Sequence, residues 1–333
     1  MKKYLLTFFI IFINLNINAE IFTTMTLNVE NLFDTYDDLN KDDKAFLPIS
    51  KKLSEEHKNS CKKIRVKTWK DECLYLDWNE KVKDAKLKNI SDLIVAYKNN
   101  GPDIIFLQEI ENNNILDQLF SLLKPYGYID KVLLEGNDYR GIDNAFISKF
   151  PIKDSKLHFI KFDGKFSNKD TRPILEASIN INGSIVRFYG VHFPAPFLNF
   201  AMRDSAFVAL NQLLMKHNDP SIAAGDFNVT REEAFKENTF YDQEKYWDIA
   251  HHIGCNKCLG TYYYAPNNDW SFLDTILVSK NRNIYFISDE IGLHKTPINM
   301  DAENLKPLGF NALSLKGVTD HIPMIAEIEL RNN

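Results

Sequence analysis

The chain has 333 residues, of which 44% are apolar and 26% are charged, as in a soluble globular protein that can bury a large core. Its formal net charge is −5, which excludes a broad positive surface for nucleic acid. Local binding of a phosphate backbone stays open, especially if a divalent cation neutralises carboxylates at the site.

The first nineteen residues have the pattern of an export signal. Lys2 and Lys3 precede an apolar run at 5–13 that is too short to span a bilayer, and Ala19 is a small residue at a plausible cleavage point. The alternatives are a membrane anchor and a buried N-terminal strand. Removing two of the 40 basic residues would leave a net charge of 38 − 45 = −7. We expect a secreted or periplasmic protein with no stable membrane association after cleavage, and a domain over 20–333.

The first strand is expected at 21–27, followed by Asn28 and Glu30. Residues 36–79 then form a Lys-rich insertion of low periodicity, interpreted as a stapled surface excursion, with a solvated loop without function as the alternative. In an oxidising compartment, local disulfides are the simplest account of the pairs Cys61–Cys73 and Cys255–Cys258. A metal knuckle is the alternative for the second pair, because a His-His dipeptide at 251–252 precedes it.

After the insertion, apolar residues at three- and four-residue spacing predict a helix over 80–98. Helices are also expected at 114–123 and 202–217. Strands are expected at 103–109, 143–150, 171–179, 185–193, 221–225, 261–264, 270–279 and 317–330. The alternation of helices and strands indicates an α/β fold with a mixed or parallel sheet.

Several of these strands end in polar residues, and ligands gather at strand ends in α/β sheets. These residues are Asn28, Glu109, His192, Asp226 with Asn228, Asp274, and Asp320 with His321. Oxygen ligands without a free thiolate suit Mg²⁺, or else Mn²⁺ or Ca²⁺. At the centre, Gly225 allows a sharp bend, after which Asp226 and Asn228 should project to one side of an extended chain while Phe227 enters the core.

Eight short blocks in order resemble the endonuclease/exonuclease/phosphatase superfamily, which includes deoxyribonuclease I. The blocks cover residues 22–330 and are Thr26–Asn28, Leu107–Glu109, Tyr139–Gly141, Thr171–Arg172, Val191–His192, Gly225–Asn228, Leu273–Asp274 and Thr319–His321. The resemblance implies a four-layered α/β sandwich, in which two mixed β-sheets pack face to face with helices outside. It also implies metal-dependent hydrolysis of phosphate esters.

The same resemblance assigns roles to the strand-end residues. Glu109 is implied as the principal metal ligand, assisted by Asn28 and Asp320. Asp226 would activate the attacking water, and Asn228 would stabilise the transition state. Three further roles are implied: His321 paired with Asp274 would polarise phosphoryl oxygens, His192 would contact the same phosphate, and Tyr139, Arg140 and Arg172 would contact substrate.

Two departures from the family pattern stand out. The long separation of Asn28 from Glu109 leaves open what covers the site. Deoxyribonuclease I gives the residue matching His192 an acidic partner, for which Asp143 is the candidate here. Arg172 has an alternative role as a salt-bridge partner.

The leading hypothesis is an exported, metal-dependent phosphodiesterase that acts on nucleic acid, with no protein partner indicated. Val229-Thr230 stands where inositol phosphatases of the superfamily have Tyr-Arg, and we find no apolar hairpin suited to membrane insertion. Alternating aromatic residues in a strand, as at 262–264 with Trp270 nearby, are expected in the core, with stacking on a base as the alternative. A local groove would bind the polyanion through Arg140, Arg172, Arg203 and Arg231. A lipid or inositol phosphate phosphoesterase and a non-catalytic binding relative are the alternatives.

Overall fold

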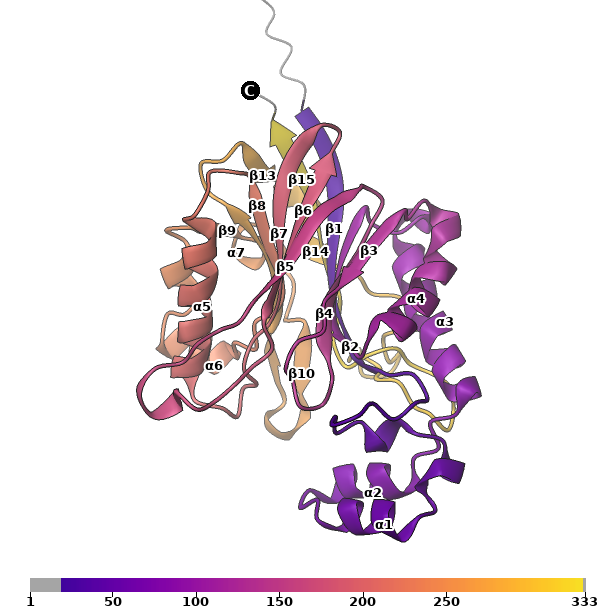
Figure 1. The fold of residues 1–333 in the computed structure, drawn as a ribbon. Helices are drawn as coiled ribbons and strands as arrows, with labels where there is room; N and C mark the ends of the chain where they lie inside the picture. The colour runs from indigo at the N-terminus through magenta and orange to yellow at the C-terminus, as the bar shows by residue number, and fades with distance from the viewer. Residues whose placement is uncertain (1–18, 332–333) are drawn as a thin grey trace, which may run out of the picture.

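Two β-sheets packed face to face form the centre of the computed structural model, which describes residues 19–331 (Figure 1). One sheet has seven strands in the order β13-β15-β1-β2-β4-β3, with β14 also paired to β15. The other has six strands in the order β5-β6-β7-β8-β12-β9. Both sheets mix parallel and antiparallel pairs, because β1–β2 and β7–β8 are parallel whereas their neighbours are antiparallel.

The strands of the first sheet are β1 (Ala19–Leu32), β2 (Ile104–Ile110), β3 (Asp130–Leu133), β4 (Asp143–Ser148), β13 (Ile284–Phe286), β14 (Gly292–Leu293) and β15 (Met324–Arg331). Those of the second are β5 (Ile152–His158), β6 (Ile174–Ile181), β7 (Ser184–His192), β8 (Ser221–Asp226), β9 (Trp247–Ile249) and β12 (Asp274–Ser279). A separate hairpin pairs β10 (Tyr262–Tyr264) with β11 (Asp269–Ser271). The α-helices are α1 (Glu55–Lys62), α2 (Lys67–Tyr75), α3 (Glu80–Ala96), α4 (Asn113–Leu123), α5 (Phe200–Leu214), α6 (Arg231–Lys236) and α7 (Ala250–Ile253).

Three apolar clusters hold these layers together. Phe106 and Phe146 of the first sheet meet Phe188 of the second in the cluster between the sheets. Helices α3 and α4 cover the outer face of the first sheet, and α5 covers the outer face of the second. The alternation of side chains along each strand explains how one strand serves two clusters. The predicted four-layered sandwich is confirmed.

Most predicted elements are present, with differences at their ends. The segment expected as a strand over 171–179 begins its strand only at Ile174, after Pro173. The segment 270–279 is two strands rather than one, because β11 belongs to the separate hairpin. The strands β3, β5, β9, β13 and β14 were not predicted. Three of them have only two or three residues, and the exposed β5 carries little apolar pattern.

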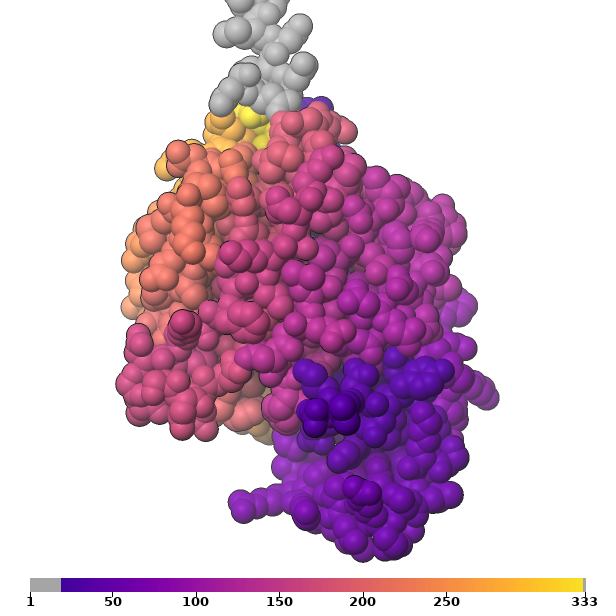
Figure 2. All heavy atoms as spheres, viewed as in Figure 1, coloured from indigo at the N-terminus to yellow at the C-terminus, as the bar shows by residue number. Residues whose placement is uncertain are grey.

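The insertion at 36–79 is more ordered than its sequence indicated. It contains the two helices α1 and α2, and Ser54 and Asn79 cap α1 and α3 through their side chains. In Figure 2 this indigo segment forms a lobe that projects beyond the sandwich. A small apolar cluster holds its base: Phe33 and Trp78 are buried and pack with Phe46 and Phe310.

Both cysteine pairs form disulfides, Cys61–Cys73 between α1 and α2 and Cys255–Cys258 after α7. The alternative metal knuckle is wrong, because the second pair is bridged and the neighbouring histidines bind elsewhere, His251 to Thr275 and His252 to Glu244. Apart from Ala19, which begins β1, the predicted leader lies outside the described residues. Within 19–331 no helix combines the length and apolar character needed to cross a bilayer.

Candidate active site

The polar strand ends predicted from the sequence meet at one edge of the sandwich. The parallel pairs β1–β2 and β7–β8 end on the same side, so Asn28 lies near Glu109 in the first sheet and His192 lies beside Asp226 in the second. A hydrogen bond from Asn28 Nδ2 to Asp226 Oδ2, 3.2 Å long, joins the two sheets at this point. The site is therefore formed by both sheets together.

On the first sheet, strained backbone positions Glu109. Its φ of 66° lies in the left-handed region, which a non-glycine residue adopts only when the surroundings hold it. Glu109 Oε2 accepts a hydrogen bond from the Asn31 amide at 3.0 Å, and Oε1 lies 3.5 Å from Asn28 Nδ2. Asn28 in turn accepts from the Glu30 amide through Oδ1.

On the second sheet, Gly225 brings β7 and β8 close together. A Cβ at this position would lie 1.9 Å from the Val191 carbonyl oxygen, and the φ of 147° also favours glycine. The next residue pair is His192 and Asp226, whose Nε2 and Oδ2 atoms are 3.5 Å apart. Burial lowers the pKa of His192 well below its usual value, and Arg172 and Arg140 lower it further, so this imidazole is neutral at pH 7.

A histidine–carboxylate pair completes the site. His321 Nδ1 lies 2.6 Å from Asp274 Oδ2, and β12 pairs with β8 so that Asp274 is opposite Asp226. Burial alone lowers the pKa of His321, but the carboxylates of Asp274 and Asp320 raise it, and the result is a pKa well above the usual value. His321 is therefore the protonated histidine of the site.

Three carboxyl groups at the site have raised pKa values. Burial raises the pKa of Asp226 to about 7 with a further contribution from Asp274, and burial with Asp320 raises that of Glu30 to about 7. The pKa of Asp320 is also raised by burial, and the Glu109 carboxylate adds to this effect. Burial is thus the main cause of these raised pKa values, and the neighbouring carboxylates add to it.

The donor set fits a divalent cation. Two buried atoms at the site, Asp274 Oδ1 and His192 Nδ1, have no hydrogen-bond partner, and ligand atoms of Asp226, Asp274 and His321 all lie within 4.8 Å of one another. The surrounding donors are mostly carboxylate and amide oxygens, which hard cations such as Mg²⁺ prefer. Glu109 and Asn28 would hold the ion at the end of the first sheet, with Asp320 on the neighbouring loop.

Asn228 differs from its expected geometry. Strand β8 ends at Asp226, and Asn228 has a φ of 55°, so the segment turns where an extended chain was expected. Phe227 is fully buried, as predicted. The Asn228 amide nitrogen of the backbone donates to Asp226 Oδ1 at 2.8 Å, and its side chain donates to the Phe193 carbonyl. In this arrangement Asn228 orients Asp226 and ties it to the end of β7.

Asp143 is not the acidic partner of His192. Its Oδ1 accepts from the Gly136 amide at 2.9 Å, while His192 Nδ1 has no partner. Arg172 lies behind His192 and donates to the carbonyls of His192 and Phe193. Its third bond goes to Asp138 at 3.2 Å, which favours the salt-bridge alternative for this arginine.

The other residues expected to contact substrate fall into two groups. Tyr139 is exposed and Arg140 is partly exposed, with one guanidinium nitrogen 3.9 Å from Glu109 Oε1, so both lie at the rim of the site. Arg203 is buried and forms an ion pair with Glu233, and Arg231 is exposed but 3.5 Å from Asp269. Of the four arginines expected in a groove, Arg172 and Arg203 are thus buried in contacts within the protein.

Glu30 and Lys86 were not selected from the sequence as site residues. The Glu30 carboxylate accepts from the Phe310 amide at 3.0 Å, and Lys86 Nζ donates to the Glu30 carbonyl. Lys86 is fully buried, and it was recognisable as a lysine four residues from both Val82 and Ile90 on the apolar stripe of α3. Such a position predicts a lysine with a buried acidic or carbonyl partner.

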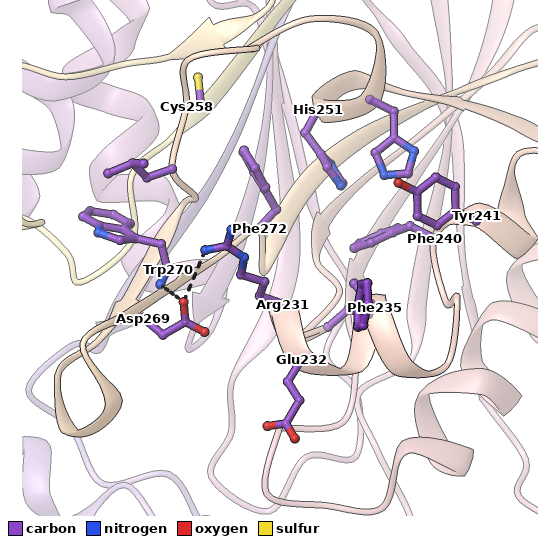
Figure 3. A pocket seen from close by; sticks show the side chains of 14 residues that line it. Arg231, Glu232, Phe235, Phe240, Tyr241, His251, Cys258, Asp269, Trp270 and Phe272 are labelled. Carbon is purple, nitrogen blue, oxygen red and sulfur yellow. Dashed lines mark hydrogen bonds and ion pairs between the residues drawn. The ribbon is translucent and has the colours of Figure 1, made fainter.

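A groove of about 510 Å³ is lined by residues of α6, α7 and the β10–β11 hairpin, together with Val229, the residue after Asn228 (Figure 3). Aromatic side chains line it, among them Phe235, Tyr241, Trp270 and Phe272, and the Arg231–Asp269 ion pair crosses one wall. The hairpin carrying Trp270 also carries the tyrosines at 262–264, which are partly exposed, so their expected place in the core is wrong. The Tyr262 ring lies 5.0 Å from that of His321.

The sandwich and the paired carboxylates at its edge define a phosphoesterase fold, and comparisons identify the family. Residues 78–293 match the model of the Endonuclease/Exonuclease/phosphatase family, to which the chain therefore belongs. No curated protein matches the chain by sequence.

Three solved structures illustrate the similarity in fold. A family protein from Bacteroides thetaiotaomicron is 16% identical with a TM-score of 0.58, and the alignment covers 94% of this chain and 98% of that one. A mannosyl-6-phosphatase from B. thetaiotaomicron VPI-5482 is 16% identical with a TM-score of 0.57, at 92% and 99% coverage. TDP2 from Caenorhabditis elegans is 13% identical with a TM-score of 0.53, at 93% and 74% coverage. At these identities the likeness concerns the fold alone.

Proposed function

We propose that the protein is an exported, divalent-metal-dependent phosphodiesterase that hydrolyses nucleic acid. The observation that carries the proposal is the convergence of Asp226, Asp274 and His321, which arrive from β8, β12 and the loop before β15 with their ligand atoms within 4.8 Å. A purely structural cluster of buried carboxylates would be expected to be fully paired, whereas Asp274 Oδ1 is left without a partner.

The residues can divide the reaction between them. Asp226 accepts a proton from a water molecule as the water oxygen bonds to phosphorus. The bond from phosphorus to the ester oxygen breaks, and the leaving oxygen keeps the electron pair and takes a proton from solvent. Protonated His321, held by Asp274, donates a hydrogen bond to a phosphoryl oxygen. Neutral His192 contacts the same phosphate. A divalent ion held by Glu109, Asn28 and Asp320 would neutralise negative charge on the phosphate.

The choice of nucleic acid rests on the surroundings of the site. The aromatic groove lined by Val229 and the partly exposed Tyr262 ring beside His321 offer flat apolar surfaces on which bases can stack. The segment that follows Asn228 is Val229-Thr230 rather than Tyr-Arg. Export is supported by the leader pattern and by the two disulfides.

A substrate panel tests the proposal. Purified mature protein is assayed with Mg²⁺ against plasmid DNA, single-stranded RNA, sphingomyelin, an inositol phosphate and mannose 6-phosphate, the last because one structural neighbour is a mannosyl-6-phosphatase. We expect nucleic acid to be cleaved fastest. The Asp226→Asn variant, purified in the same way, controls for contaminating nucleases. Faster hydrolysis of a lipid or sugar phosphate would reassign the substrate. No hydrolysis of any substrate would favour the alternative of a non-catalytic binding protein.

A further inference from the structure

One stretch of the insertion concentrates positive charge in an otherwise acidic protein. Between His57 and Lys70 there are six basic residues and no carboxylate, namely Lys58, Lys62, Lys63, Arg65, Lys67 and Lys70. We call residues 55–75, which comprise α1, α2 and their connection, the basic arm. With Glu55, Glu56, Asp71 and Glu72 counted, the arm carries a net charge of 6 − 4 = +2, whereas the chain as a whole carries −5.

Most of this charge is not neutralised within the protein. Lys58 pairs with Glu55 and Lys67 with Asp71. In the part of the chain that the structure describes, no ion pair joins a carboxylate to Lys62, Lys63, Arg65 or Lys70. The side chains of Lys62, Lys63 and Arg65 are exposed at the end of α1 and in the connection that follows it.

The arm presents these charges on a fixed frame. Cys61 and Cys73 link the two helices and are both buried. Lys52 is also buried, and its ammonium group donates to the carbonyls of Ala45, Glu72 and Leu76, which ties the end of α2 to the base of the insertion. Such a frame positions charges more precisely than a flexible Lys-rich loop would, because little entropy is lost when a ligand binds.

The start of the insertion, which precedes the basic arm, contacts the rim of the active site. The Asp42 amide donates to the Tyr139 carbonyl at 2.8 Å, and Lys41 Nζ donates to the Asp138 carbonyl at 2.9 Å. Arg140, which follows Tyr139 in the chain, has a guanidinium nitrogen 3.9 Å from Glu109 Oε1 of the site. The arm therefore projects from the same edge of the sandwich as the strand ends that form the site, as Figure 1 shows.

We propose that the basic arm binds the phosphate backbone of a nucleic-acid substrate and holds it across the active site. The inference rests on the proposed function and supplies the positive charge that buried Arg172 and Arg203 do not provide. Trp69 is 58% exposed among the basic residues and adds a ring on which a base can stack. Alternating cations and an aromatic ring suit a nucleic acid better than a bilayer, which requires a continuous apolar face.

The experiment compares two full-length variants that change the net charge equally. Lys62→Glu/Lys63→Glu/Arg65→Glu reverses the arm, while Lys153→Glu/Lys156→Glu/Lys216→Glu reverses three exposed lysines on β5 and after α5. Binding of a fluorescein-labelled 30-base-pair DNA and of a 30-nucleotide RNA is measured by anisotropy in chelator, which prevents cleavage. Turnover of bis(4-nitrophenyl) phosphate with Mg²⁺ reports on the active site alone.

We expect the arm variant to bind either nucleic acid at least tenfold more weakly than the control variant at about 0.1 M salt. The slope of log K against log salt should fall by about 2 to 3, or roughly one per lost phosphate contact. Turnover of the small diester should stay within twofold. Lys62→Gln/Lys63→Gln/Arg65→Gln should show a smaller loss, because it removes attraction without adding repulsion.

Three results would overturn the proposal. The first is equal nucleic-acid binding by the arm and control variants, and the second is no measurable binding by the wild-type protein. The third comes from a parallel measurement with phosphatidylglycerol vesicles, in which the arm variant loses vesicle binding but keeps nucleic-acid binding. If the arm variant loses nucleic-acid binding but the wild type cleaves no nucleic acid, the arm assignment stands and the proposed function fails. If cleavage occurs and both variants bind equally, the reverse holds.

Discussion

The active-site edge and the basic arm handle charge in opposite ways. At the site, buried carboxylates from both sheets lie close together. Burial, with a contribution from Asp274, raises the pKa of Asp226 to about 7. On the arm, cations are exposed and largely without carboxylate partners. Buried charged groups with shifted pKa values are typical of the residues that carry out chemistry. Exposed charges on a rigid frame are suited to long-range attraction of a ligand.

Removal of divalent metal should have the largest effect and should separate the two regions. Excess chelator is expected to abolish phosphodiester hydrolysis, because the site carboxylates would repel a phosphate without a cation between them. Mg²⁺ or Mn²⁺ should restore the rate, while binding of nucleic acid by the arm persists in chelator. Full activity in excess chelator, checked by metal analysis of the protein, would contradict the metal assignment.

Substitution of Asp226 or His321 should lower the rate of hydrolysis somewhat less than removal of the metal does. Asp226→Asn and His321→Ala are each expected to lower turnover by about 100-fold or more, because each removes a proton acceptor or a donor to the phosphate. His217→Ala, a change to a histidine after α5 that bonds Tyr189 away from the site, is the control. A variant that keeps more than about a tenth of wild-type turnover, a barrier change under about 1.4 kcal/mol, would contradict the role assigned to its residue.

The fold should survive the first of these changes. Asp226→Asn removes a buried charge that Asp274 repels, so its melting temperature should equal or exceed that of the wild type at pH 7. Calorimetry provides the measurement. A large drop in melting temperature would mean that lost turnover reflects unfolding and would leave the catalytic role of Asp226 unsupported.

Opening the arm disulfide should affect the arm and spare the site. Cys61→Ser/Cys73→Ser removes a link across 12 residues, which is worth about 3 kcal/mol of local stability by chain entropy. We expect faster proteolysis between α1 and α2 and weaker nucleic-acid binding, with unchanged turnover of a small diester. Cys255→Ser/Cys258→Ser is the matched control, and equal proteolysis of the arm in both variants would show that the disulfide does not hold it.

The smallest effect is expected away from both regions, at Glu176 on β6. Hydrogen bonds from His158 and Arg187 lower the pKa of Glu176 to about 2, although burial opposes them. Because the folded pKa is below the unfolded one, this carboxylate stabilises the protein above about pH 4.5, and the contribution is lost as pH falls towards 2. Glu176→Gln should therefore lower stability at pH 7, and its melting temperature should converge on that of the wild type in acid. Parallel curves down to pH 2.5 would contradict this.

The sequence predicted the fold and the residues at its edge because both depend on short-range patterns. Apolar runs ending in Asn28, Glu109 and His192 mark strand ends, and parallel pairing brings such ends together without further information. The roles of these residues stay predictions, since only their proximity is observed. Which neighbour each side chain contacts was not predictable, because Asp143 is bonded by the nearby Gly136 amide and Arg172 by Asp138, which is 34 residues away.

The insertion shows the opposite limit. Its helices have few buried residues, so their apolar periodicity is weak, and the structure of the arm depends on the Cys61–Cys73 link and on buried Lys52. A lysine whose ammonium group is bound by three carbonyls has no signature in a Lys-rich sequence. Only tertiary packing distinguishes Lys52 from the exposed lysines around it.

The pairing of Ala19 with Arg331 has a practical consequence for handling the protein. Strands β1 and β15 are antiparallel neighbours, so the two ends of the described chain lie side by side at the tip of the sandwich farthest from the arm (Figure 1). A short linker could therefore join them in a circular permutant, with new ends opened at the exposed turn Asn182-Gly183. Attachment to a bead through either end would likewise leave the catalytic edge facing solution.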